Sequence, residues 1–443
     1  MNAILLLMGL LMLSYIGSFL VGGRVLRGFG LPSGSEYVIL GFLLGPFALG
    51  LLDRSTLDAF KPLADVALGW LALVVGLGFG FVGNRRVGAV RIGVGAGLAL
   101  ATGGAVAAAI WFAAERLAPA LHPRDRALLA LGVGAACAET TRHAILWVMQ
   151  RHRASGPLSS LIADLADSDD LAPLLLMGVA FSLAPTAAVP WPIPFYAWTL
   201  VTLALGVALG LIAVVLLGSD FRLIQSWGVL LGTSLLTIGT AARAGLSPLL
   251  AAFAMGVTIA AVSRHREEIV TMVAPTEQPV LLPALLLAGA HIDPRAAPFL
   301  LPIAVVAIAV RVVAKLGTGL VVRAAFPEAR GTGRSIGLGL LSSGAVAISV
   351  GLAFALRFPG PVGGTVLAVA VAATLFGEFS GPAALRAVLR QAGEITEPAI
   401  AAPAQPAQAS DGAGRSEPPA QAGDGAGRSE PPAQAGDLEG ARQ

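Results

Sequence analysis

The 443-residue sequence predicts an all-α membrane protein that crosses the bilayer about thirteen times. Hydrophobic residues make up 56% of the chain and charged residues only 12%, whereas soluble domains carry about 25% charged residues. The apolar residues come in runs of roughly 20, the length that an α-helix needs to cross the hydrocarbon core. A soluble domain is therefore excluded, and most of the chain should face lipid or other buried helices.

The predicted spans follow one another along the chain and are separated by short loops. We expect them at residues 2–22, 35–52, 63–83, 90–114, 126–150, 158–182, 195–217, 222–242, 246–262, 268–290, 298–324, 333–356 and 362–385. The first span begins next to Met1 without basic residues before it, and Arg24 and Arg27 follow it. We interpret it as an uncleaved anchor with its N-terminus outside. An odd number of spans then places the C-terminus in the cytoplasm, and the loop arginines lie mainly on that side, as expected for a multi-pass protein of the cell (inner) membrane.

The last part of the chain has a different composition. From about residue 396, Pro, Ala, Gln, Gly and Ser dominate, and the 13-residue unit DGAGRSEPPAQAG begins at Asp411 and repeats from Asp424. Such a segment has almost no apolar surface to bury and should stay disordered. We therefore predict two domains, a transmembrane domain at residues 1–392 and a disordered cytoplasmic tail at residues 393–443.

Several classes of function lack their characteristic residues here. The single cysteine, Cys137, lies in an apolar run, which excludes a disulfide framework and a thiolate metal site. The chain has no nucleophile triad, phosphate-binding loop or dinucleotide fingerprint, so we expect neither an enzyme nor a bound cofactor. The 29 basic residues are scattered over short loops, and we predict the lipid bilayer rather than a nucleic acid as their surroundings.

Four aspartates lie in the predicted span at residues 158–182, namely Asp164, Asp167, Asp169 and Asp170. By helical rise, the last two lie roughly 17 Å into the span, near the middle of a hydrocarbon core of about 30 Å. A charge at that depth costs at least about 2.5 kcal/mol, and two adjacent carboxylates cannot both ionise there without partners. We expect this pair to bind either protons or an alkali cation. A polar loop at 164–170 is the alternative, but it would leave too few apolar residues for a span.

Two basic residues lie in the predicted span at residues 298–324. Lys315 lies about 13 Å from the cytoplasmic end by helical rise, further than its side chain can comfortably reach. Arg311 lies one turn earlier on the same face, near the midplane. We expect one of them to be the counter-ion of Asp169, released when the site takes up a proton or a cation. Their depth does not decide between them, and a structural role at a helix C-terminus stays open for each.

The predicted span at residues 126–150 carries hydroxyl and charged side chains. Thr140 and Thr141 offer hydroxyl oxygens and, if the helix is interrupted, free carbonyl oxygens for an ion. Threonines in membrane helices often only bond to the preceding turn, so they are weak evidence alone. Three more residues of this span could modulate the site: Glu139, Arg142 and His143. The acid and the histidine are four residues apart and could pair with each other. No transition-metal site has its ligands here.

Seven stretches along the chain occur in an order typical of one family. They are GLPSGSEYVILGFLLGPFALGLL, ADVALGWLALVVGLGFG, GAACAETT, SDDLAP, PALLLAGAHIDP, GLGLLSSGAVAISVGLAF and GEFSGPAALRAVL. Together they resemble the monovalent cation:proton antiporter superfamily, most like its second bacterial branch, up to about residue 392. GAACAETT and GLGLLSSGAVAISVGLAF are similar to the two crossing helices of the family, and SDDLAP is similar to its Asp-Asp or Asn-Asp motif.

The resemblance implies a fold of two inverted repeats, with a dimerising panel and a mobile core that carries two crossing, discontinuous helices. It also implies a homodimer and elevator-type alternating access. Carried over to this chain, Asp170 is the carboxylate for the cation and the proton, and Asp169 is the partner of the basic residue on the eleventh span. An Asp-Asp pair resembles the electrogenic sodium/proton members. The charges in the fifth span and the two extra aspartates of the sixth depart from the family's pattern.

Exchange of a monovalent cation for protons is therefore the predicted function, with Na⁺ as the first candidate and K⁺ or Li⁺ as others. Two alternatives stay open. A membrane sensor could bind an ion on this fold without transporting it, because a fold does not determine a function. An organic-anion symporter on a related inverted-repeat fold could use Arg142 and Arg311 to bind carboxylates.

Overall fold

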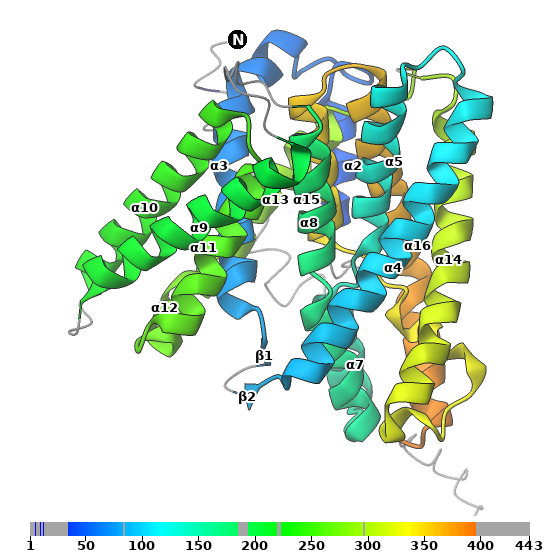
Figure 1. The fold of residues 1–443 in the computed structure, drawn as a ribbon. Helices are drawn as coiled ribbons and strands as arrows, with labels where there is room; N and C mark the ends of the chain where they lie inside the picture. The colour runs from blue at the N-terminus through cyan, green and yellow to red at the C-terminus, as the bar shows by residue number, and fades with distance from the viewer. Residues whose placement is uncertain are drawn as a thin grey trace, which may run out of the picture. The chain divides into compact units, whose positions relative to one another are not determined.

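The computed structural model describes residues 34–82, 85–184, 194–218, 223–295 and 297–395, together with the single residues 5, 9 and 12. Among these residues the chain is a bundle of α-helices (Figure 1). The helices are α2 (Ser35–Leu44), α3 (Arg54–Gly78), α4 (Ala89–Leu117), α5 (Pro123–Ala138), α6 (Arg142–His152), α7 (Pro157–Ser168), α8 (Leu171–Ser182), α9 (Phe195–Leu217), α10 (Leu223–Ala244), α11 (Pro248–Val262), α12 (Arg266–Val273), α13 (Glu277–Ala290), α14 (Leu300–Ala325), α15 (Ala345–Arg357) and α16 (Pro361–Gln391). Short 3₁₀ helices occur at η1 (Ala274–Thr276), η2 (Pro327–Ala329) and η3 (Arg334–Leu340), and the strands β1 (Phe81–Val82) and β2 (Arg85–Arg86) pair antiparallel.

The prediction of an all-α polytopic membrane protein is confirmed. In the described ranges, seven helical segments are long and apolar enough to cross a membrane, namely α3, α4, α9, α10, the α12–α13 segment, α14 and α16. The segment α9 has the predicted bounds, 195–217. The predicted first span at residues 2–22 and the repeat tail lie outside the described residues, apart from the three single ones, so the count of thirteen spans stays a prediction.

Four of the predicted spans are not continuous helices of the predicted length. The helix α2 ends at Leu44, well before the predicted end of its span. The other three are interrupted: 126–150 consists of α5 and α6, 158–182 of α7 and α8, and 333–356 of η3, residues 341–344 and α15. Hydropathy averages over a window do not detect these breaks, because each break is only a few residues long. The predicted span 268–290 is one helical run that includes the 3₁₀ turn η1 between α12 and α13.

Local sequence sets where several helices begin. The helices α5, α7, α11 and α16 start with a proline, whose fixed φ and missing N–H suit the first helical turn. The carboxylate of Asp53 accepts a hydrogen bond of 2.8 Å from the backbone N–H of Thr56 and so caps α3. Ser247 caps α11 in the same way.

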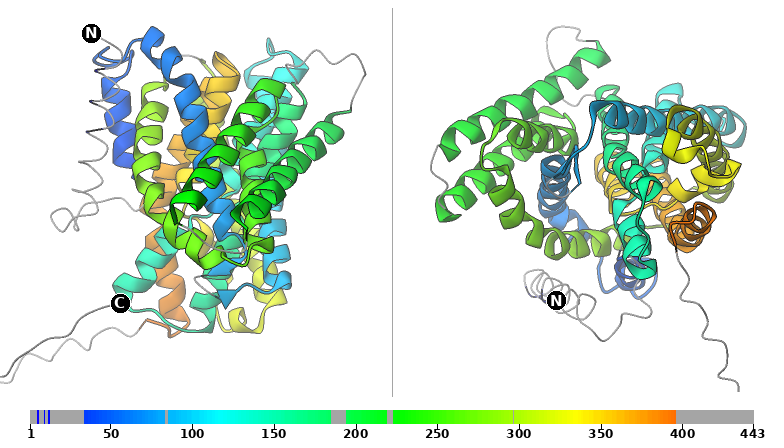
Figure 2. Two further views of the ribbon diagram at one scale, coloured as in Figure 1. Left: turned by 90° about the vertical axis from the view of Figure 1, so that its left-hand side faces the viewer. Right: turned by 90° about the horizontal axis from the view of Figure 1, so that it is seen from below.

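The helices form two groups that pack mainly within themselves. One group, which we call the panel, contains α2, α3 and α9 to α13, with α3 against α11 and α2 against α13. The other group, which we call the core, contains α4 to α8 and α14 to α16, with α4 against both α5 and α14. Figure 1 shows α9 to α12 on one side and α4, α14 and α16 on the other, and the view from below in Figure 2 shows the same separation.

The panel helices cross at glycines. A Cβ atom at Gly41 would lie 1.9 Å from the carbonyl oxygen of Leu286, and one at Gly289 would lie 2.0 Å from the main chain of α2. Gly76 and Gly256 bring α3 and α11 together in the same way, with 2.4 Å on each side. Small residues allow such close approaches of membrane helices.

Candidate functional site

Two interrupted helices of the core cross each other at their breaks. After α5 ends at Ala138, residues 139–141 are extended until α6 begins, and residues 341–344 separate η3 from α15. The backbone N–H of Thr141 donates to the carbonyl of Ser342 at 3.2 Å, and the Thr140 hydroxyl donates to the carbonyl of Leu340 at 3.0 Å. The broken form of the fifth span, which was one possibility on sequence grounds, is therefore the observed one.

Arg311 of α14 connects the two breaks. Its side chain is buried, with 1% of its surface exposed. Its Nη2 donates to the carbonyl oxygen of Glu139 at 2.7 Å and to that of Ser342 at 3.3 Å. These carbonyls have lost their helical partners at the breaks. The guanidinium therefore satisfies main-chain acceptors of the crossing and makes no ion pair with Asp169.

Glu139 does not pair with His143, contrary to what their spacing suggested. Its Oε2 accepts hydrogen bonds from the backbone N–H of Ala347 at 2.6 Å and of Gly344 at 3.4 Å, at the N-terminus of α15. A carboxylate at a helix N-terminus is stabilised by the helix dipole. The i, i+4 rule fails because the helix is broken between the two residues. His143 instead lies 3.6 Å from Glu277 of α13.

Lys315 is the basic residue next to Asp169. Its Nζ lies 3.6 Å from Asp169 Oδ2, and it donates to the Thr140 hydroxyl at 2.6 Å and to the Ala138 carbonyl at 3.2 Å. With 3% of its surface exposed, the lysine does not extend to the membrane surface. The contacts therefore favour Lys315 over Arg311 as the partner of Asp169.

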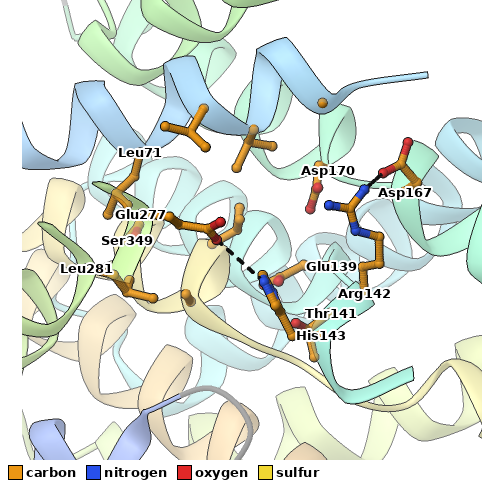
Figure 3. A pocket seen from close by; sticks show the side chains of 15 residues that line it. Leu71, Glu139, Thr141, Arg142, His143, Asp167, Asp170, Glu277, Leu281 and Ser349 are labelled. Carbon is orange, nitrogen blue, oxygen red and sulfur yellow. Dashed lines mark hydrogen bonds and ion pairs between the residues drawn. The ribbon is translucent and has the colours of Figure 1, made fainter. Parts of the chain in front are cut away.

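Asp169 and Asp170 lie at the junction between α7 and α8 in unequal surroundings. Asp169 is buried, and its Oδ1 has no hydrogen-bond partner in the described part of the chain. Asp170 is half-buried and lines a cavity of about 90 Å³ (Figure 3). The cavity lies between the panel helices α3 and α13 and the core. Its other polar walls include Glu139, Thr141, Arg142, Asp167, Glu277 and Ser349.

The two extra aspartates of the sixth span have basic partners. Asp164 pairs with Arg85 and, at 2.6 Å, with Arg91. Asp167 pairs with Arg142 and also accepts a hydrogen bond of 3.2 Å from the backbone N–H of Gly80. These ion pairs lie on the side of the α7–α8 junction that faces the end of α3 and the strand pair.

Glu277 and Glu378 are among the acidic residues inside predicted spans that sequence reasoning missed. Glu277 lines the cavity and faces His143 across it. Glu378 of α16 is buried and accepts a hydrogen bond from the hydroxyl of Ser35 on α2. A carboxyl group inside an apolar span is itself a signal of a polar role, so both could have been selected by the criterion that selected Asp169 and Asp170.

Comparison with known protein families identifies the family to which this chain belongs. The family described as "Sodium/hydrogen exchanger, transmembrane" matches residues 15–386. The chain belongs to the sodium/hydrogen exchanger family. This confirms the resemblance to cation:proton antiporters, and it places the chain among multi-pass membrane transporters rather than enzymes.

Solved structures agree with this fold of the sodium/hydrogen exchanger family. The sodium proton antiporter MjNhaP1 from Methanocaldococcus jannaschii at pH 8 superposes with a TM-score of 0.64 at 14% identity, covering 86% of this chain and 100% of that chain. An electron-microscopy structure of the same antiporter gives a TM-score of 0.57 at 16% identity, covering 88% and 96%. At such identities the likeness concerns the fold alone. No curated protein matches the chain.

Proposed function

We propose that this protein exchanges Na⁺ for H⁺ across the membrane and that the two ions compete for the carboxylate of Asp170. The position of Asp170 carries the proposal. Its side chain lies at a helix junction inside the bundle and faces a cavity, and no basic side chain of the described ranges forms an ion pair with it. A half-buried carboxylate inside the bundle without a fixed counter-ion can be neutralised either by a proton or by a cation.

The oxygen atoms around the junction suit a hard monovalent cation. Thr141 lines the same cavity as Asp170 and offers a hydroxyl oxygen. The Thr140 hydroxyl already accepts from Lys315 and donates to Leu340. Thr141 is therefore the better ligand of the two threonines, while Thr140 and Asp169 position Lys315. Li⁺ and K⁺ are the competing substrates to test.

Alternating access is proposed to be of the elevator type, with the core moving against the panel. Two polar contacts join the core to the panel side at the cavity, from Gly80 to Asp167 at 3.2 Å and from His143 to Glu277 at 3.6 Å, and such a motion would have to break both. We further propose a homodimer in the inner membrane with the N-terminus outside, and a cytoplasmic tail that takes no part in transport.

The purified protein in liposomes tests this proposal. With an acidic lumen and a pH-sensitive dye, addition of Na⁺ outside should raise the lumenal pH at a saturable rate. Empty liposomes are the control. A dye signal that is the same with and without Na⁺, Li⁺ or K⁺ would contradict cation:proton exchange. Cation binding without flux would identify a sensor, and anion-dependent proton movement would identify a symporter.

The ion pair between Asp169 and Lys315 leads to a prediction about voltage. The pair is a second group beside Asp170 that can take up or release a proton. If it takes part in transport, the wild type moves more protons than cations in each cycle. Asp169→Asn leaves one carboxylate at the junction, so each cycle should exchange one cation for one proton. Transport should persist and lose its dependence on membrane potential. The measurement is the initial rate of exchange at clamped potentials.

The matched control for this variant is Asp58→Asn, which removes the same charge from an exposed position on α3. It should stay as voltage-dependent as the wild type. If Asp169→Asn also responds to voltage like the wild type, the pair with Lys315 has no role in the coupling.

A further inference from the structure

Arg142 occupies an unfavourable place for a cation. It is the first residue of α6, whose N-terminus lies at the break in the middle of the core. The N-terminus of a helix carries a partial positive charge, so an arginine there is destabilised unless a carboxylate compensates it. Asp167 is that carboxylate, and its pair with Arg142 is the only hydrogen bond or ion pair found for this arginine in the described ranges.

The guanidinium also lies in the cavity of Asp170. Arg142, Asp167 and Asp170 all line it. Figure 3 shows the guanidinium beside both carboxylates, with its ion pair directed to Asp167. Arg142 therefore lies in the same cavity as a second carboxyl group besides that of its partner Asp167. A guanidinium has five N–H donors in a planar fork, so a change of side-chain torsion can exchange one carboxylate for the other.

Asp167 is better held than its partner. The side chain of Asp167 is 5% exposed and also accepts the N–H of Gly80 at the end of α3, whereas that of Arg142 is 34% exposed. The carboxylate of Asp167 is thus held in place by a second hydrogen bond, and the side chain of Arg142 is the more mobile member of the pair. Gly80 follows the panel helix α3, and Asp167 belongs to the core. The hydrogen bond that holds Asp167 therefore depends on how the panel and the core are placed relative to each other.

We propose that Arg142 is a tethered cation that competes with the transported cation for Asp170, and that Asp167 holds it aside while the cavity is loaded. The inference rests on the proposed function and adds a residue that determines apparent cation affinity. Two simpler roles of the pair predict different results. In the first, the pair only joins α6 to α7. In the second, each charge acts on the transported ion by through-space electrostatics, and the arginine does not move.

A double-mutant cycle separates the tether from these two simpler roles. We measure the apparent KM for Na⁺, the maximal rate and the Tm of the wild type, Arg142→Gln, Asp167→Asn and the double variant in liposomes. Arg142→Gln should lower KM several-fold, because the competitor is gone. Asp167→Asn should raise KM by roughly tenfold, because the freed arginine moves to Asp170. In the Arg142→Gln background this effect should nearly vanish. Coupling of this size is typical of residues that belong to the same ion-pair network.

Two further variants complete the design. Arg142→Lys retains the tethered charge and should keep KM near the wild-type value. Arg151→Gln makes the same substitution at an exposed position of α6 and should leave KM unchanged. Should Asp167→Asn not fold, Asp167→Ser takes its place in the cycle. The comparison of Arg142→Gln with Arg142→Lys separately distinguishes the tether from a purely structural pair, since only loss of the charge should lower KM.

The outcomes distinguish this inference from the proposed function. An equal rise of KM on Asp167→Asn in both backgrounds would show simple electrostatics and overturn the tether. A lowered Tm with unchanged KM in Arg142→Gln would show a structural pair and overturn it too. Wild-type liposomes without cation-dependent proton flux would instead overturn the exchange function itself.

Discussion

Asp170→Asn should abolish cation:proton exchange while leaving the protein folded. The amide has nearly the shape of the carboxylate, so the packing at the junction of α7 and α8 stays, but the charge that faces the cavity is lost. Two unit charges about 4 Å apart attract by about 4 kcal/mol at an effective dielectric constant of about 20, and about 1.4 kcal/mol is a tenfold change. Cation binding should therefore weaken by roughly a thousandfold, and the amide cannot carry the returning proton.

The measurement is the Na⁺-dependent rise of lumenal pH in liposomes, with the Tm as evidence of folding. Asp170→Glu keeps a carboxylate and should retain measurable exchange, and Asp58→Asn controls for loss of a negative charge elsewhere. A rate of Asp170→Asn equal to the wild-type rate at saturating Na⁺ would remove Asp170 from the proposed mechanism and direct attention to Glu139 or Asp167, which line the same cavity.

The depth of the important charges could be predicted from the sequence. Helical rise within an apolar run places Asp169, Asp170, Arg311 and Lys315 far from both membrane surfaces, and all but Asp170 are buried in the structure. The cost of a charge in hydrocarbon makes such positions visible without any structure. The long apolar segment α9 likewise has the predicted bounds.

The partners of these charges could not be predicted. Arg311 and Lys315 lie one turn apart on one face of α14, so helical geometry makes them equivalent. What separates them is the crossing: Arg311 meets the carbonyls of both breaks, and Lys315 lies one turn further along, next to Asp169. That distinction depends on segments that lie 31 and 172 residues from Arg311 in the chain.

The helix breaks at the crossing could not be predicted either, because they also depend on contacts with other segments. Residues 139–141 are Glu-Thr-Thr, without the glycine or proline that would mark an interruption. The helix opens there because Arg311, Lys315 and the second break supply hydrogen bonds that replace the helical ones. The spacing of Glu139 and His143 would allow them to pair only on a continuous helix, and the tertiary contacts of the break prevent that.

Gly337→Ala should destabilise the site more than any other single methyl group added to the core. A Cβ atom at Gly337 of η3 would lie 1.8 Å from the carbonyl oxygen of Lys315 and 3.1 Å from the Cα of Gly319. The atoms it meets belong to the main chain of α14, which cannot turn away as a side chain could. Overpacking typically costs about 1–3 kcal/mol and sometimes more, and we expect the upper end here.

The displacement acts on function as well as on stability. Pushing η3 away from α14 separates the second crossing helix from the helix that carries both Arg311 and Lys315. The expected result is a Tm lowered by roughly 5 °C or more together with a loss of exchange. The readouts are thermal unfolding of the purified protein and the liposome assay on the fraction that stays folded.

Gly317 supplies the matched control, on the helix α14 that Gly337 of η3 contacts. A Cβ atom there has no heavy atom within 4 Å, so Gly317→Ala adds the same methyl group to α14 in open space. Alanine is the better helix former by about 1 kcal/mol, and this variant should be slightly more stable and fully active. If the two alanine variants have the same Tm, the close approach of η3 to α14 does not hold the crossing together, and the contacts of Arg311 must carry it alone.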